Sequence, residues 1–154
     1  VIMATLKVKI QEDVILENQD YSSKRVNEIT GVNDVLKRIV SVPANTDTTI
    51  VNFEANVGAD TGATPIDVDL LKYMRISNLD SSNSVNLAVV GDTMNFQVVL
   101  EAGHSYLLSK ADDGMVVEGA TDTSPAFSGF EEINQLMIDS GSNAVKIEIF
   151  IASA

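Results

Sequence analysis

Apolar and polar residues alternate one for one near both ends of the chain. Towards the C-terminus, an apolar residue occupies every second position at Val145, Ile147, Ile149 and Ile151. Towards the N-terminus, Leu6, Val8 and Ile10 alternate with lysine and glutamine. Because successive side chains of a β-strand point to opposite faces, this spacing predicts strands that bury one face and expose the other. We therefore expect both ends to belong to β-sheets.

Further strand-like segments recur at short intervals between the two ends. They span residues 35–42, 48–55, 70–78, 85–90, 94–100, 105–109, 115–118 and 136–139. Most are rich in β-branched residues, and Gly, Asn, Asp, Ser or Pro separate them. About nine or ten short strands joined by tight turns predict an all-β fold, an antiparallel β-sandwich of the jelly-roll type.

Helix is expected to be scarce. Short helical turns are predicted only at residues 66–71 and 130–136, the second with Ser128 as a cap and Glu131 in its first turn. The loops 56–65 and 119–129 are too short to separate domains. We therefore expect a single β-sandwich domain over residues 1–154, with residues 4–16 as an N-terminal strand or arm.

The chain carries 10 basic and 22 acidic residues, which gives a net charge of −12. Such a charge repels the phosphate backbone, so we expect no nucleic-acid partner. Residues 77–154 contain only Lys110 and Lys146 against 11 acidic residues, and we expect this half to face solvent. No stretch approaches the roughly 18 apolar residues that a membrane span needs, so no membrane partner is expected either.

Catalytic chemistry has little support in the sequence. The chain has no cysteine, and its single histidine is His104. A Ser-His-Asp arrangement is formally possible. However, Ser128, in the stretch Ala-Phe-Ser-Gly-Phe, lacks the first glycine of a nucleophile elbow. We predict no catalytic residues and no enzymatic activity.

Metal binding is also expected to be absent. One histidine without cysteine cannot complete a zinc site. Calcium needs only oxygen ligands, and two acidic groups offer them: Asp60, Asp67 and Asp69, and Asp112, Asp113 and Glu118. No EF-hand loop occurs, and acidic residues beside glycine form turns for backbone reasons alone. We expect no metal and no cofactor, with calcium at an acidic turn as the open alternative.

Several segments resemble small structural proteins that tailed phages, particularly marine phages and cyanophages, encode near their capsid genes. The resemblance lies in an N-terminal strand, residues 29–43, the strand end Arg-Ile-Ser-Asn-Leu-Asp at 75–80, and the turn Val-Val-Leu-Glu-Ala-Gly-His-Ser at 98–105. These motifs are framework rather than active-site motifs. The resemblance implies a capsid decoration (cement) protein or a related virion component.

This resemblance implies particular partners and a location. They are the major capsid protein and further copies of the chain, in a homo-oligomer such as a trimer, on the exterior of the capsid after assembly in the host cytoplasm. Two alternatives stay open: a tail-fibre or knob module that binds a host glycan, and a capsid or tail-tube subunit. Since an unpaired strand edge can add to a neighbour's sheet, Leu6, Val8 and Ile10 of the N-terminal strand are the predicted partner-binding residues.

Overall fold

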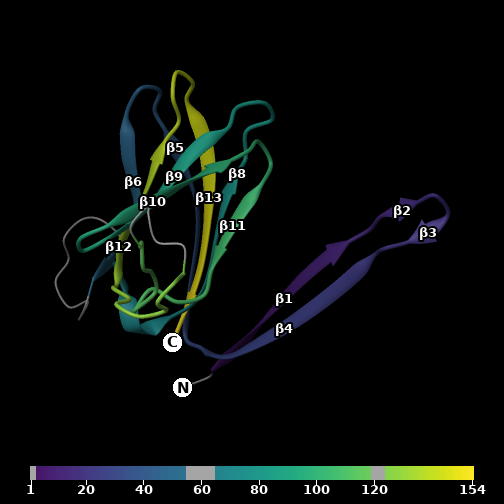
Figure 1. Cartoon of the computed structure of the whole chain (residues 1–154), viewed down its shortest axis with the longest axis horizontal. Helices are drawn as coiled ribbons and strands as arrows, with labels where there is room; N and C mark the ends of the chain where they lie inside the picture. Colours follow the sequence, from purple (N-terminus) through teal and green to yellow (C-terminus); the bar gives the residue numbers. More distant parts are fainter. Residues whose placement is uncertain (1–2, 55–64, 119–123) are drawn as a thin grey trace.

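The computed structural model describes residues 3–54, 65–118 and 124–154. Apart from one 3₁₀ turn, the regular secondary structure of the described residues is β-strand, and it forms two parts, a two-layered sandwich and a long hairpin that projects from it (Figure 1). The hairpin contains β1 (Ala4–Glu12), β2 (Ile15–Leu16), β3 (Gln19–Asp20) and β4 (Ser23–Val32). The sandwich contains β5 (Asp34–Val42), β6 (Asp47–Glu54), β7 (Pro65–Asp67), β8 (Leu71–Asn78), β9 (Val85–Gly91), β10 (Asn95–Leu100), β11 (Ser105–Leu108), β12 (Ile133–Asp139) and β13 (Val145–Ser153).

The sandwich has the strand order of a jelly roll. One sheet runs β10-β9-β12-β6-β7 and the other runs β11-β8-β13-β5. All neighbouring pairs are antiparallel except β6 with the short β7, which are parallel. Apart from β7, each sheet therefore holds four strands drawn from distant parts of the chain, as in a double Greek key. The predicted all-β sandwich is confirmed.

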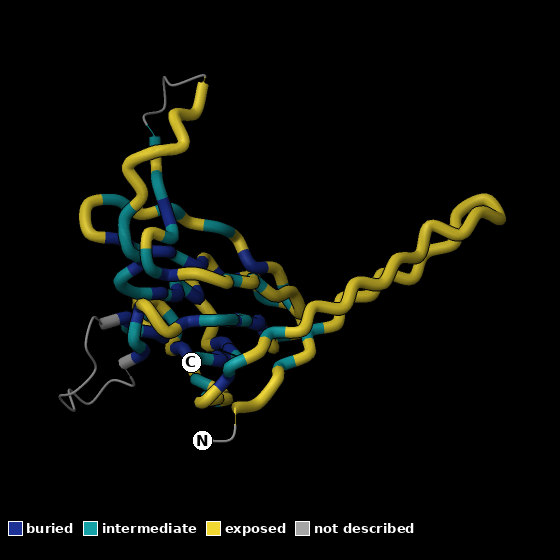
Figure 2. Tube along the Cα trace, turned by 90° about the horizontal axis from the view of Figure 1, so that it is seen from below, coloured by how far each residue is buried: buried dark blue, intermediate teal, exposed yellow. Residues whose placement is uncertain are grey.

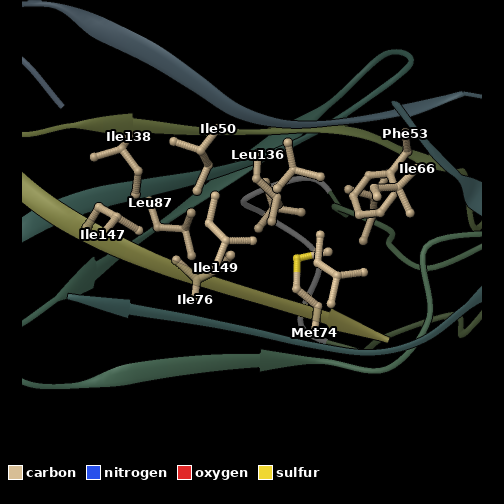
Figure 3. Close-up of a cluster of buried hydrophobic side chains, with 14 of the residues drawn as sticks. Ile50, Phe53, Ile66, Met74, Ile76, Leu87, Leu136, Ile138, Ile147 and Ile149 are labelled. Carbon is tan, nitrogen blue, oxygen red and sulfur yellow. The ribbon is translucent and has the colours of Figure 1, made fainter. Parts of the chain in front are cut away.

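The core lies between the two sheets and is aliphatic (Figure 3). The strand predicted near the C-terminus buries its apolar face as expected, because Ile147, Ile149 and Ile151 of β13 are at most 1% exposed. Phe53 is the aromatic side chain among the buried core residues. Fully burying one aliphatic side chain contributes about 1.5–3 kcal/mol to the free energy of folding. The branched side chains between the two sheets therefore supply most of the hydrophobic stabilisation.

The projecting hairpin is long and almost wholly exposed (Figure 2). β1 pairs with β4 from Ala4↔Val32 to Glu12↔Ser23, and β2 pairs with β3 beyond them. Val32, at the base, is 2% exposed, and the backbone N–H of Asn33 donates a 2.9 Å hydrogen bond to the carbonyl of Ser153 in β13. The base is thus tied to the sandwich, while the rest of the hairpin extends away from it.

Three predictions about local structure are corrected or refined. Residues 130–136 are not helical, because Ile133, Leu136 and Ile138 form the buried face of β12. Residues 115–118 do not form a strand; Met115 makes only an isolated bridge with Glu131. The turn predicted at 66–71 is the three-residue 3₁₀ helix Val68–Leu70, capped by Asp67. Most of the predicted loop 56–65, and residues 119–123 of the second loop, lie outside the described residues.

The predicted N-terminal arm, residues 4–16, forms β1 and β2. The structure adds the return strand β4, which the alternation of apolar and polar residues did not indicate. We call residues 4–32 the arm and residues 12–22 the arm tip.

Candidate functional site

The arm tip exposes large apolar side chains. The exposed fractions are 47% for Val14, 75% for Ile15, 61% for Leu16 and 58% for Tyr21. Ile15 and Leu16 are consecutive strand residues and therefore point to opposite faces of the hairpin. Apolar side chains gathered at an exposed end in this way mark a contact surface.

Local hydrogen bonds give the arm tip a defined shape. Glu17 and Asn18 have φ angles of 51° and 65°, as in a two-residue type I′ turn. The N–H of Tyr21 donates to the carbonyl of Val14 at 3.0 Å, and the N–H of Val14 donates to Oγ of Ser22 at 3.0 Å. The tip therefore presents its apolar side chains without first having to become ordered.

The charge of the arm differs from that of the sandwich. The arm contains four basic and five acidic residues, a net charge of −1, whereas the rest of the chain carries −11. Within the arm the charges are separated. The arm tip holds Glu12, Asp13, Glu17 and Asp20 and no basic residue. The tip is thus both apolar and locally acidic.

The predicted partner-binding residues Leu6, Val8 and Ile10 share one face of β1. Leu6 and Val8 are half-buried, and Ile10 is 41% exposed. This face borders a notch of about 350 Å³ between the arm and the sandwich, on the side of β11. Its lining residues are Val8, Ile10, Arg25, Asn27, Tyr73, Leu107, Leu108 and Ser109. Val8 and Ile10 thus line an apolar notch, and β4 covers one edge of their strand.

The outer face of the four-stranded sheet combines apolar and basic side chains, and we call it the basic face. Register pairs identify its members: Ala152 lies between Val35 and Tyr73, Phe150 between Lys37 and Arg75, and Glu148 between Ile39 and Ser77. Val35 is 50% and Ile39 58% exposed. The rings of Tyr73 and Phe150 meet edge to face, with centroids 6.1 Å apart.

Glu148 is the acid among these register-paired residues, and basic side chains hold it on both sides. Nη2 of Arg75 donates a hydrogen bond to Oε1 of Glu148 at 2.6 Å, and Nζ of Lys37 lies 3.6 Å from Oε2. The hydrogen bond from Arg75 holds the pKa of the Glu148 carboxyl below its ordinary value of 4.5. Lys146, the next outward residue of β13, leaves the face with a surplus of positive charge.

The outer face of the five-stranded sheet carries a groove of about 420 Å³ that is lined by both polar and apolar side chains. Asp47, Asn86, Asn95, Gln97 and Asp139 supply its polar groups. Among the described residues, neither an aromatic nor a basic side chain lines it. The two outer faces of the sandwich therefore differ in the sign of the charges that they carry.

The motif at residues 75–80, one of those that carry the phage resemblance, ends β8 and begins the turn to β9. Nδ2 of the buried Asn78 donates to the carbonyls of Asn83 and Leu100 at 2.8 and 3.1 Å. The carboxylate of Asp80 accepts the N–H groups of Ser82 and Asn83, which lowers its pKa. Together they close the turn from β8 to β9, a framework role.

His104 is an exposed turn residue between β10 and β11. Its N–H donates to the carbonyl of Glu101 at 3.0 Å, and its carbonyl accepts the N–H of Asn78 at 3.0 Å. Both interactions belong to its backbone.

The acidic residues considered for calcium do not converge. Within residues 3–54, 65–118 and 124–154, no three His, Cys, Asp or Glu side chains are placed to hold a metal ion. Asp67 caps the 3₁₀ helix by accepting the N–H of Asp69 at 3.0 Å, and Asp60 lies outside the described residues. Partial burial, followed by the charges of Asp112 and Asp69, raises the pKa of the nearby Glu132.

Comparison of the chain with protein-family models, curated protein sequences and solved structures finds no match. In the part of the chain that the structure describes, no helix has the length and apolar character of a membrane span.

Proposed function

We propose that the chain is a virion structural protein, a capsid decoration (cement) protein that binds the outer capsid surface as an oligomer and stabilises the joints between capsid subunits. The observation that carries this proposal is the arm, because a hairpin with exposed apolar side chains at its end has no evident use within its own fold. Such an element is suited to contact a neighbouring subunit.

Three further features support this proposal. The motifs at residues 75–80 and 98–105 resemble those of small phage structural proteins, and the structure gives them framework roles. The sandwich carries a net charge of −11, which favours a position away from the packaged genome. The N–H and the carbonyl of His104 make backbone hydrogen bonds that hold a turn, which is a structural role.

The experiment that tests this proposal uses purified particles of the virus that encodes the chain. Mass spectrometry should find the chain in a fixed ratio to the major capsid protein. Particles stripped of the chain should lose resistance to heat, and adding back the purified chain should restore it. Particles that contain no copy of the chain, or whose stability is unaffected by it, would contradict the proposal.

A second candidate is a tail-fibre or knob module that binds a host glycan. The groove on the five-stranded sheet supports it, because carboxylate and amide groups such as those of Asp47, Asn86 and Gln97 can hydrogen-bond sugar hydroxyls. A glycan array should then show a signal that Asn86→Ala and Gln97→Ala each reduce about tenfold, the effect of losing roughly 1.4 kcal/mol. An array without signal would count against this candidate and leave the first one intact.

A further inference from the structure

We infer that the arm tip of one copy docks on the basic face of a second copy of the same chain. This inference rests on the proposed function and names the partner of the arm. It combines three observations: an exposed tip with apolar and acidic side chains, an exposed sheet face with apolar and basic side chains, and an arm that holds the tip away from its own sandwich.

The charges of the two surfaces are complementary. The tip contributes four carboxylates and no cation. The basic face contributes Lys37, Arg75 and Lys146 against Glu148, in a chain whose net charge is −12. On the opposite outer face, the described residues that line the groove include Asp47 and Asp139 and no cation, so this face repels the tip. Electrostatics therefore selects one of the two faces and sets the orientation of the contact.

The apolar groups of the two surfaces are also complementary. Val35 and Ile39 on β5 are each at least 50% exposed. Both are diagonal neighbours of the half-buried Phe150, whose ring contacts that of Tyr73 on the same face. Ile15 and Leu16 at the tip lose water when they cover such a surface, at about 25 cal/mol for each Å² of apolar area buried. This gain adds to the charge attraction.

The direction of the arm favours a second copy as the partner. The nine residues of β1 rise about 3.3 Å each, which places the arm tip about 30 Å from the arm base. The base is tied to β13 through Asn33 and Ser153. Figure 1 shows the arm projecting away from the sandwich, so the tip lies away from its own basic face, whereas a neighbouring copy can present one. Because tip and face are different surfaces, each copy gives one arm and receives another, and the contact closes into a ring when the rotation allows it.

The absence of cysteine from the sequence makes a disulfide test direct. One population of the full chain carries Ile15→Cys at the tip and a second, with a tag that changes its size, carries Ile39→Cys on the basic face. Oxidation of the mixture should give a mixed dimer. The matched control replaces Ile39→Cys by Val99→Cys, at a position of similar exposure (62%) on β10 of the opposite sheet. We expect the tip–face yield to exceed the tip–Val99 yield at least tenfold.

Each outcome decides the inference. A dominant mixed dimer, reduced when Lys37→Glu is added to the face partner, supports it. Equal yields with both face positions, a product made only of Ile15→Cys homodimer, or no mixed dimer would overturn it. A chain that fails this test yet is found in a fixed ratio on purified particles would retain the proposed function without self-docking. A mixed dimer from a chain that is absent from particles would support self-docking and contradict the proposed function.

Discussion

At the residue scale, the side chains with the most defined roles are charged or polar ones that hold turns and strands in place. Glu148 joins β13 to its neighbours through Arg75 and Lys37. Glu131 joins the turn between β9 and β10 by accepting hydrogen bonds from the N–H and Oγ1 of Thr93 and the N–H of Met94. Both carboxylates hold neighbouring elements of the fold together.

Glu148 predicts a pH dependence of stability. Its folded-state pKa is lowered from 4.5, so its contribution is present above that value and is lost as pH falls through the lower folded pKa. Glu148→Gln should therefore lower the melting temperature at neutral pH but have little effect in strong acid. The neutral-pH loss should be about 0.5–1 kcal/mol, as for a partly exposed ion pair. Thermal melts across pH check this, and a difference that does not depend on pH would contradict it.

A side chain at position 91 is expected to cause a steric clash. A Cβ at this position would collide with Oε1 of Glu131 and lie 3.0 Å from the carbonyl oxygen of Glu132. Gly91→Ala should therefore displace the Glu131 carboxylate and destabilise the sandwich by about 1–3 kcal/mol in denaturant unfolding. In a Glu131→Ala background the same substitution should have a smaller effect, because the clashing side chain is gone. An equal effect in both backgrounds would show that the collision is not its cause.

At the scale of elements, the arm is the part whose conformation depends least on the core. Glu17 and Asn18 form a turn in which both residues have positive φ angles. Asn at the first position and Gly at the second adopt such angles more readily. Replacing them by Glu17→Asn and Asn18→Gly should stabilise the arm by about 1 kcal/mol. Hydrogen exchange should then slow about fivefold for arm amides and stay unchanged for β13. Faster exchange in the arm would mean that the turn is not of this type.

Substitutions at the arm tip should change self-association without changing the stability of the fold. Changing Ile15 and Leu16 together to Ser removes two apolar side chains of the tip without changing its charge, and both residues are more than 60% exposed. The free energy of unfolding should therefore change by less than about 0.5 kcal/mol. Sedimentation should show a large loss of self-association, whereas the matched substitution Val99→Ser on the opposite sheet should leave it unchanged. A similar loss in both variants would remove the special role of the tip.

The strands of the sandwich could be predicted because each buries one face. An example is the alternation of apolar residues at Ile147, Ile149 and Ile151, all of which are buried. β4 could not be predicted, since both of its faces are exposed over most of its length and no burial selects its residues. Glu131 and Glu132, just before β12, are typical of the first turn of a helix. The residues that follow them nevertheless form a strand with buried apolar side chains. The order of strands in the sheets depends on contacts between distant segments, which no local pattern records.

At the scale of the whole molecule, a jelly roll with an acidic surface carries a projecting arm that is almost neutral. The predicted residues Leu6, Val8 and Ile10 lie on this arm, but its exposed apolar end comprises Val14, Ile15, Leu16 and Tyr21. The sequence contained one signal for it, an apolar cluster flanked by acidic residues without a buried periodicity. Jelly rolls serve many functions, so the arm rather than the fold carries the functional argument.

The proposed contact between arm tip and basic face predicts sensitivity to salt. Four carboxylates on one surface and a net positive face on the other attract each other at low ionic strength. Raising the salt concentration from about 0.05 to 0.5 M should weaken self-association about tenfold, as the charges are screened. Sedimentation equilibrium measures this change. Association that strengthens with salt would indicate a purely apolar contact.

Shortening the arm shows whether it attaches the protein to its partner. Replacing residues 13–22 by Asn-Gly joins Glu12 to Ser23, which already face each other in the ladder, and leaves the sandwich intact. The measurement is co-sedimentation of the full and shortened chains with stripped particles of the virus that encodes the chain. We predict saturable binding of the full chain and at least a hundredfold weaker binding of the shortened chain, because linked copies bind through many contacts at once. Equal binding by two chains with the same melting temperature would contradict the proposed role of the arm.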